Sequence, residues 1–261
     1  MVVLTAPFGQ TSNRFFQHIH IDSFCRDNGI NFYNKFLADL YQEYPSLKIK
    51  TANKIFNYII RYIVKLKFNN FEFSNEMQVD YYKLLILKSR ILFCTGWYFR
   101  SFETTKKYRS FYQKLFTPNL DQLFLNTLWL EKTNVHEKIV GVHIRRGDYE
   151  LFNDGLYFYT DLTYIDKVKQ MASLLDNNCR FIIFTNEEKL AISNFTAQFD
   201  NIRLSKNTVV IDHYLMSKCD YIIGPPSTFS LWASYIGETF FYHIKQENDY
   251  IKLDDFKVCN G

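Results

Sequence analysis

The chain has 261 residues, of which 47% are hydrophobic and 22% charged, and its formal net charge is +4. These values exclude a disordered chain, a collagen-like repeat and a coiled-coil rod, and the length suffices for one large or two smaller domains. Basicity this mild does not point to nucleic acid, which requires a strongly basic face. We therefore expect no nucleic-acid partner.

The five cysteines are widely spaced and form no CxxC pair. This pattern predicts neither a disulfide framework nor a zinc site, and it favours a reducing cytoplasm. The first residues lack the basic start of a signal peptide, and no segment approaches the ~20 apolar residues that span a bilayer. We expect a cytoplasmic protein.

The first ninety residues are expected to be mainly helical after an opening strand. Apolar residues at helical spacing predict helices over 13–26, 51–67 and 105–130, and a buried strand over 91–98 that ends at Gly96. Residues 48–67 hold six lysines and arginines and no acidic residue. This basic segment fits either a packed amphipathic helix with a solvated polar face or a peripheral contact with anionic lipid at the inner face of a membrane.

The second half alternates short apolar runs with helical patterns. Strands are predicted over 138–144, 180–185, 208–211 and 221–224, and helices over 163–175, 190–198, 212–218 and 227–236. Such alternation predicts a parallel sheet, and strands that are apolar on both faces predict a sheet covered on both sides. A polar stretch near 132–138 divides the chain into domains 1–135 and 136–261.

The strongest local signal is the segment from Val142 to Tyr149, in which His143, Arg145, Arg146 and Asp148 follow a buried strand. Ligands bind at the carboxyl ends of strands in open α/β sheets, and guanidinium groups suit phosphate oxygens. The alternative is an Arg–Asp ion pair that braces a turn. The tripeptide that starts at Arg146 also matches a cell-adhesion ligand, which a strand end would not display.

A second signal follows the strand that ends at Gly224. Two prolines fix the turn, and Ser227 or Thr228 then occupies a helix N-cap whose free N–H groups can bind an anion. The alternative is an ordinary cap with Phe229 and Trp232 in the core. Taken with the two arginines, the pattern favours a diphosphate site. The sequence contains no P-loop, no GxGxxG and no Asp-x-Asp pair, so we expect no metal and no cofactor.

The segment 142–149 resembles the HxRRGDY motif of the GDP-fucose-dependent alpha-1,2-fucosyltransferases of glycosyltransferase family 11, in their bacterial form. Four further segments resemble family motifs in the family order, and they cover 9–17, 181–188, 212–223 and 227–233. The sequence departs from those motifs at Thr185–Glu187, which replaces Ser-Asp-Asp, at Pro225–Pro226, and at Leu231, which replaces a tryptophan.

This resemblance implies an α/β, GT-B-like fold of two Rossmann-like domains with a cleft between them. Residues 1–135 would form a helix-rich acceptor-side domain, and residues 136–261 would hold GDP-fucose. The implied reaction is the inverting, metal-independent transfer of L-fucose to O-2 of a terminal galactoside. The implied acceptor is a bacterial surface glycan such as a lipopolysaccharide side chain, including a lipid-linked form.

The resemblance also implies roles for single residues. Arg145 would stabilise the leaving diphosphate, and Asp148 would act as general base or would brace an arginine. The implied donor-binding residues are His143, Arg145, Arg146, Glu187, Asp212, Ser227, Thr228 and Phe229. The implied residues of the acceptor side of the cleft are Gly9, Asn13 and Arg14. Two alternatives stay open: a fucosyltransferase of alpha-1,6 or protein-linked type, and a non-catalytic nucleotide-sugar or glycan-binding module.

Overall fold

The computed structural model describes residues 1–50, 70–119 and 130–261. The chain divides into two compact units: unit 1 contains Met1–Asn119 and Asn260–Gly261, and unit 2 contains Leu120–Cys259. The predicted 51–67 helix and the later part of the predicted 105–130 helix lie outside the described residues.

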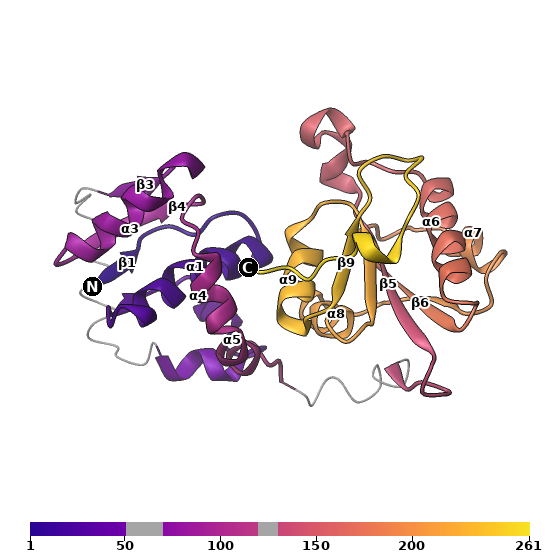
Figure 1. The fold of residues 1–261 in the computed structure, drawn as a ribbon, viewed down its shortest axis with the longest axis horizontal. Helices are drawn as coiled ribbons and strands as arrows, with labels where there is room; N and C mark the ends of the chain where they lie inside the picture. The colour runs from indigo at the N-terminus through magenta and orange to yellow at the C-terminus, as the bar shows by residue number, and fades with distance from the viewer. Residues whose placement is uncertain (51–69, 120–129) are drawn as a thin grey trace. The chain divides into compact units, whose positions relative to one another are not determined.

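Unit 1 contains a parallel sheet of four strands in the order β2-β1-β4-β3 (Figure 1). The strands are β1 (Val2–Leu4), β2 (Phe32–Tyr33), β3 (Phe71–Phe73) and β4 (Leu92–Gly96). The helices are α1 (Thr11–Asp27), α3 (Val79–Lys88), α4 (Phe102–Lys107) and α5 (Arg109–Leu115). One core cluster joins these elements, because side chains of β1, β3 and β4 pack with those of α1 and α3.

The opening strand, the 13–26 helix and the strand that ends at Gly96 are confirmed. The strands β2 and β3, which were not predicted, complete a parallel sheet beside the predicted helices. Both strands are only two or three residues long, too short for a period to be visible in the sequence. The first part of the predicted 105–130 helix is two short helices that meet at Tyr108.

Unit 2 contains a parallel sheet of five strands in the order β7-β6-β5-β8-β9. The strands are β5 (Lys138–Ile144), β6 (Cys179–Thr185), β7 (Ile202–Leu204), β8 (Tyr221–Gly224) and β9 (Phe240–His243). The helices are α6 (Asp161–Leu174), α7 (Ser193–Thr196), α8 (Val209–Met216) and α9 (Thr228–Gly237). The outer strand β9 also forms an antiparallel bridge between Phe241 and Lys257.

Side chains of the central strand β5 alternate between the two faces of the sheet. Val140, Val142 and Ile144 join the core cluster that contains α6, and Ile139 joins the cluster that contains α8 and α9. Figure 1 shows α6 on one side of β5 and β6 and the α8–α9 pair on the other. Because the period of a strand is two, His143 faces α8 and α9 together with Ile139. The predicted sheet with two covered faces is confirmed.

The strands predicted at 138–144, 180–185 and 221–224 and the helix at 227–236 are confirmed. The strand predicted at 208–211 is wrong: Thr208 caps α8, and its side chain accepts a hydrogen bond from the N–H of Ile211. The third strand is β7, and the predicted 190–198 helix is reduced to α7. β-Branched residues in the first turn of α8 gave the misleading signal.

Candidate active site

The carboxyl ends of β5, β6 and β8 meet at one edge of the unit 2 sheet, as parallel pairing requires. β5 leads into the 3-10 turn Gly147–Glu150, β6 leads into Asn186 and Glu187, and β8 leads through two prolines into α9. The residues predicted from the two sequence signals therefore lie on adjacent strands of one sheet. This edge is where open α/β sheets bind ligands.

Arg145 directly follows β5 and has one ion-pair partner in the described part of the chain. Its Nη2 donates to Oδ2 of Asp148 at 2.9 Å. The side chain of Arg145 is 18% exposed and that of Asp148 is 56% exposed, so water screens the pair from one side. The guanidinium also lies 5.5 Å from the centre of the Tyr149 ring. Arg145 is thus held in place while much of its charge remains uncompensated.

Arg146 has a different environment, because two carboxylates bind it. Its Nη1 donates to Oε2 of Glu187 at 2.8 Å, and its Nη2 donates to Oδ1 of Asp161 at the start of α6. The side chain of Asn186 accepts from the N–H of Arg146 at 2.8 Å and donates to its carbonyl oxygen at 2.8 Å. These contacts make Arg146 a brace between β5, β6 and α6. The predicted donor-binding residue Glu187 lies in this brace.

Gly147 allows the turn that follows the arginines. Its φ of +68° lies in the left-handed region, where a Cβ is strained. The chain therefore reverses at once after Arg146 and brings Asp148 back to Arg145.

Ser227 is the N-cap of α9, and its Oγ accepts from the N–H of Phe229 at 3.3 Å. Thr228 is the first residue of the helix. The hydroxyl of Tyr149 donates to the carbonyl oxygen of Pro226 at 2.6 Å, so the loop after β5 is bonded to the turn before α9. Tyr149 contacts Arg145 as well, and it therefore links the arginine to the N-terminus of α9. Backbone N–H groups there attract anions.

Phe229 lies between two buried histidines. Its ring stacks on His143 at 5.0 Å and on His213 of α8 at 4.0 Å, measured between ring centres. Nδ1 of His143 is also hydrogen-bonded to Oγ of Ser230 at 2.5 Å. Burial lowers the pKa of both imidazoles to about 3, so both are neutral at physiological pH. The stack fixes β5, α8 and α9 together beneath the arginine loop.

The close approach of β8 to β5 requires a glycine at position 224. A Cβ at Gly224 would lie 2.8 Å from the carbonyl oxygen of His143 and 2.9 Å from its Cβ. Any larger residue would push apart the two strands that carry Arg145 and Ser227.

Asp212 is buried on α8, with 7% of its surface exposed. Burial raises the pKa of its carboxyl group to about 6, and hydrogen bonds with Ser205 and Asn207 oppose that shift. Above about pH 6 this carboxyl group is ionised, and its oxygens can then accept hydrogen bonds from N–H donors of a ligand. Ser205, Asn207 and Ser230 were not predicted as site residues, because their roles depend on contacts across the sheet edge.

The three residues predicted for the acceptor side lie in unit 1. Gly9 has a φ of +59°, and a Cβ there would lie 2.1 Å from Nδ2 of Asn13. Arg14 forms an ion pair with Asp39 and donates to the carbonyl oxygen of Phe36. The structure thus brings Gly9 and Asn13 together and binds the Arg14 side chain within unit 1.

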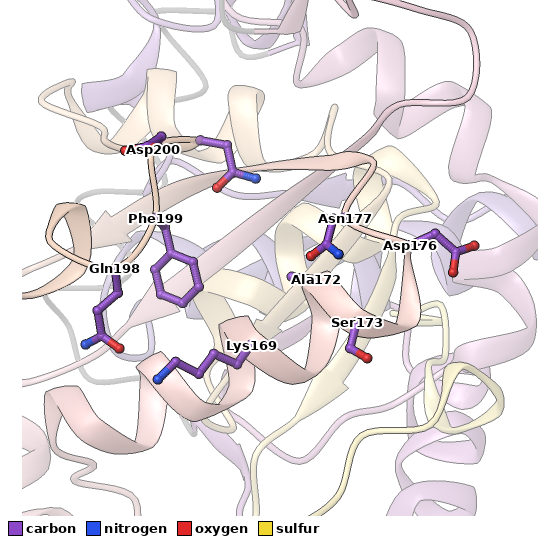
Figure 2. A pocket seen from close by; sticks show the side chains of 9 residues that line it. Lys169, Ala172, Ser173, Asp176, Asn177, Gln198, Phe199 and Asp200 are labelled. Carbon is purple, nitrogen blue, oxygen red and sulfur yellow. The ribbon is translucent and has the colours of Figure 1, made fainter.

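A pocket of about 810 Å³ in unit 2 lies away from these residues, at the amino ends of β6 and β7 (Figure 2). Its walls are the end of α6 and the segment 198–201. Among residues 1–50, 70–119 and 130–261, no group of three or more His, Cys, Asp or Glu side chains is arranged to hold a metal ion. In the same ranges, no helix has the length and apolar character needed to cross a membrane.

The two parallel sheets and the anion-attracting edge of unit 2 define a GT-B-like α/β protein, and comparison with known structures agrees. The chain resembles an alpha-1,6-fucosyltransferase, NodZ, solved after soaking with GDP-fucose, with a TM-score of 0.57 at 13% identity; the match covers 95% of this chain and 96% of that one. At this identity the likeness shows the fold alone.

The model of glycosyl transferase family 11 matches residues 17–250, and the chain belongs to that family. An alpha-1,2-colitosyltransferase of Escherichia coli is 31% identical over 134 residues, which are 48% of this chain and 44% of the relative. The O-antigen biosynthesis glycosyltransferase WbnK of Escherichia coli is 27% identical over 201 residues, 73% of this chain and 63% of the relative. The matches span less than two thirds of either relative.

Proposed function

We propose that the protein transfers L-fucose from GDP-fucose to O-2 of a terminal galactoside on a glycan, with inversion and without a metal. The observation that carries the proposal is the environment of Arg145. Within the described residues its guanidinium has a single, exposed carboxylate partner, and it is linked through Tyr149 to the N-terminus of α9. A doubly charged leaving group such as a nucleoside diphosphate fits two adjacent sources of positive potential.

The arrangement supports a direct displacement. An acceptor hydroxyl attacks the anomeric carbon of fucose, the bond from that carbon to the β-phosphate oxygen breaks, and GDP leaves with the bonding electrons. Negative charge grows on the diphosphate in the transition state. Arg145 and the N–H groups at the start of α9 stabilise it, and one such donor contributes about 3–4 kcal/mol.

The base that accepts the hydroxyl proton is Asp148 in this proposal. Asp148 is exposed, adjacent to Arg145 and free to rotate once the diphosphate takes its place on the guanidinium. In the structure it occupies the bracing position, bonded to Nη2 of Arg145. Diphosphate binding would therefore release the carboxylate that the reaction needs.

The nucleoside end of the donor fits the buried carboxylate of Asp212, which can accept the N–H groups of a guanine ring. The stack of Phe229 on His143 and His213 fixes α8 and α9 to each other at that end of the site. Arg146 and Glu187 act in this proposal by holding the β5 and β6 loops in position.

The acceptor side would come from unit 1, with Gly9 and Asn13 in its first loop. The O-antigen relative supports a glycan acceptor of the lipopolysaccharide type, including a lipid-linked one at the inner face of a membrane. The basic segment 48–67, of which 51–67 lie outside the described residues, is the proposed membrane contact. Salt-sensitive co-sedimentation with anionic vesicles tests it, and no binding at low salt refutes it.

The activity is tested by incubating the protein with GDP-fucose and a panel of galactosides while GDP release is measured. We expect release that depends on acceptor, persists in EDTA, and gives an alpha-1,2 product by NMR. An alpha-1,6 or protein-linked product would support the other linkage, and GDP binding without acceptor-dependent release would support a binding module. Loss of activity in EDTA with recovery in Mn²⁺ would refute the metal-free mechanism.

A second candidate donor is a colitosyl nucleotide, because the relative at 31% identity is an alpha-1,2-colitosyltransferase. The same assay with a GDP-linked colitose in place of GDP-fucose separates the two. The donor with the higher kcat/KM on one acceptor is the substrate.

A further inference from the structure

An exposed aromatic ring, Phe8, and a half-buried one, Trp97, form a stacked pair at the carboxyl ends of neighbouring strands in unit 1. Phe8 lies in the loop after β1, and Trp97 directly follows β4. Their ring centres are 5.1 Å apart with an interplanar angle of 22°. Phe8 is 42% exposed although a phenyl ring would be more stable in the core. Together with Arg100 we call these residues the Trp97 platform.

The platform is held rigidly by buried polar contacts. The amide of Gln17, which is 2% exposed, accepts from the N–H of Phe8 at 3.2 Å and donates to the carbonyl oxygen of Gly96 at 2.8 Å. One side chain of α1 thus fixes both loops that carry the rings. The N–H of Trp97 also donates to the carbonyl oxygen of Phe73 at 3.2 Å. Such anchoring keeps the partly exposed stack ordered before any ligand arrives.

Arg100 extends the platform with a guanidinium group that has no direct ion-pair partner in the described part of the chain. Its guanidinium carbon lies 4.0 Å from the centre of the Trp97 ring, and Nη1 donates to the carbonyl oxygens of Trp97 and Phe99. No carboxylate lies within ion-pair distance of Arg100 in the described ranges 1–50, 70–119 and 130–261. Burial lowers the pKa of Arg100 to about 10. Its other donors remain available to ligand oxygens.

We propose that the Trp97 platform binds a pyranose ring of the glycan acceptor, an inference that rests on the function proposed above. The axial C–H groups of a hexopyranose form an apolar face that packs on flat aromatic rings, while ring hydroxyls at its edge accept from a guanidinium. The platform offers both features side by side. It also lies at the strand ends where a parallel sheet binds ligands. A bracing stack would not need an exposed Phe8 ring fixed by a buried glutamine.

The proposal is tested by glycan binding without donor, using saturation-transfer NMR with lactose and N-acetyllactosamine. We expect signal from the sugar ring protons with the wild-type protein and loss of at least tenfold in affinity with Trp97→Ala or Phe8→Ala. Trp97→Phe should recover part of the affinity. Tyr81→Ala removes an exposed aromatic ring elsewhere in unit 1 and serves as the matched control. Thermal unfolding and GDP affinity should stay unchanged in all variants.

Two results separate this inference from the proposed function. Unchanged acceptor KM and unchanged glycan binding in Trp97→Ala, in a protein that transfers fucose, would overturn the platform and leave the function standing. Glycan binding that Trp97→Ala abolishes, in a wild-type protein that transfers no sugar, would support the platform and refute the function. Absence of binding to either galactoside by the wild-type protein also overturns the platform.

Discussion

The hydroxyl of Tyr149 donates to the carbonyl oxygen of Pro226 at 2.6 Å, and this bond joins the arginine loop to the turn before α9. The two sources of positive potential in the site, Arg145 and the N-terminus of α9, are therefore held in position relative to each other. If either moved by about an ångström, the diphosphate could not contact both. The site is one unit built from two loops that are 77 residues apart in the sequence.

Tyr149→Phe should lower kcat without altering the fold. The substitution keeps the ring next to Arg145 and removes the hydroxyl, and with it the bond to Pro226, which contributes roughly 1 kcal/mol. We expect kcat to fall about fivefold to tenfold. Tyr159→Phe is the matched control, because it removes a bond to the carbonyl oxygen of Ile244 and lies outside the proposed machinery. Equal kcat values for the two variants would contradict the coupling.

Arg145→Gln should lower activity and leave stability unchanged, whereas Arg146→Gln should lower stability. The ion-pair partner of Arg145, Asp148, is exposed, so loss of Arg145 should lower kcat by about 10²–10³ and leave the melting temperature nearly unchanged. Arg146→Gln leaves Asp161 and Glu187 close together without their shared cation and should cost about 2 kcal/mol of stability. Calorimetry and GDP-release kinetics on both variants check this. Near-normal turnover in Arg145→Gln would remove that residue from the mechanism.

Asp212→Asn should make the protein more stable and a weaker nucleotide binder. The raised pKa of about 6 means that the folded state holds a proton that the unfolded state has lost between about pH 4 and pH 6. Stability of the wild type therefore falls as pH rises through that window, and the variant escapes this loss of about 2–3 kcal/mol above pH 6.

Chemical unfolding of both proteins at pH 4 and pH 7.5 measures the difference. We expect the variant to be favoured at pH 7.5 and the two to converge at pH 4. Titration with GDP should show weaker binding by the variant at pH 7.5, and wild-type affinity that declines below about pH 6 as the carboxylate is protonated. Equal GDP affinity would exclude Asp212 from the nucleoside site.

Gly224→Ala should weaken both the fold and the site. The added methyl group would clash with the backbone of His143, and the overpacking should cost about 1–3 kcal/mol. His143 would move with β5, so GDP affinity should fall as well. Urea unfolding and GDP titration check the two effects, and a stable variant with normal affinity would show that the strands can separate without harm.

The local signals in the sequence predicted the central strand of unit 2 and its arginine loop. A short β-branched run followed by charged residues is informative, because a buried strand that ends at the surface produces this pattern. The same logic failed at 208–211, where a β-branched run begins α8 behind the cap residue Thr208. The distinction depends on Thr208 and on packing over the sheet, which a four-residue window does not contain.

The different environments of Arg145 and Arg146 could not be predicted from the sequence. Asp161 and Glu187 lie 15 and 41 residues from Arg146 in the sequence, and only the fold brings them to its guanidinium. The Trp97 platform was missed for the same reason, because Phe8 and Trp97 meet only when β1 pairs with β4. A sequence motif identifies functional residues that are neighbours in the sequence. These pairs instead form between residues that only the fold brings together.

The antiparallel bridge between Phe241 and Lys257 has a consequence for the protein at high concentration. Phe241 and Lys257 exchange both backbone hydrogen bonds, at 2.9 and 3.1 Å, on the open side of the outermost strand. An uncovered outer strand would offer these groups to the sheet of another molecule. The segment around Lys257 therefore protects this edge of the sheet against edge-to-edge aggregation. We expect its removal to lower the solubility of the protein before it lowers the catalytic rate.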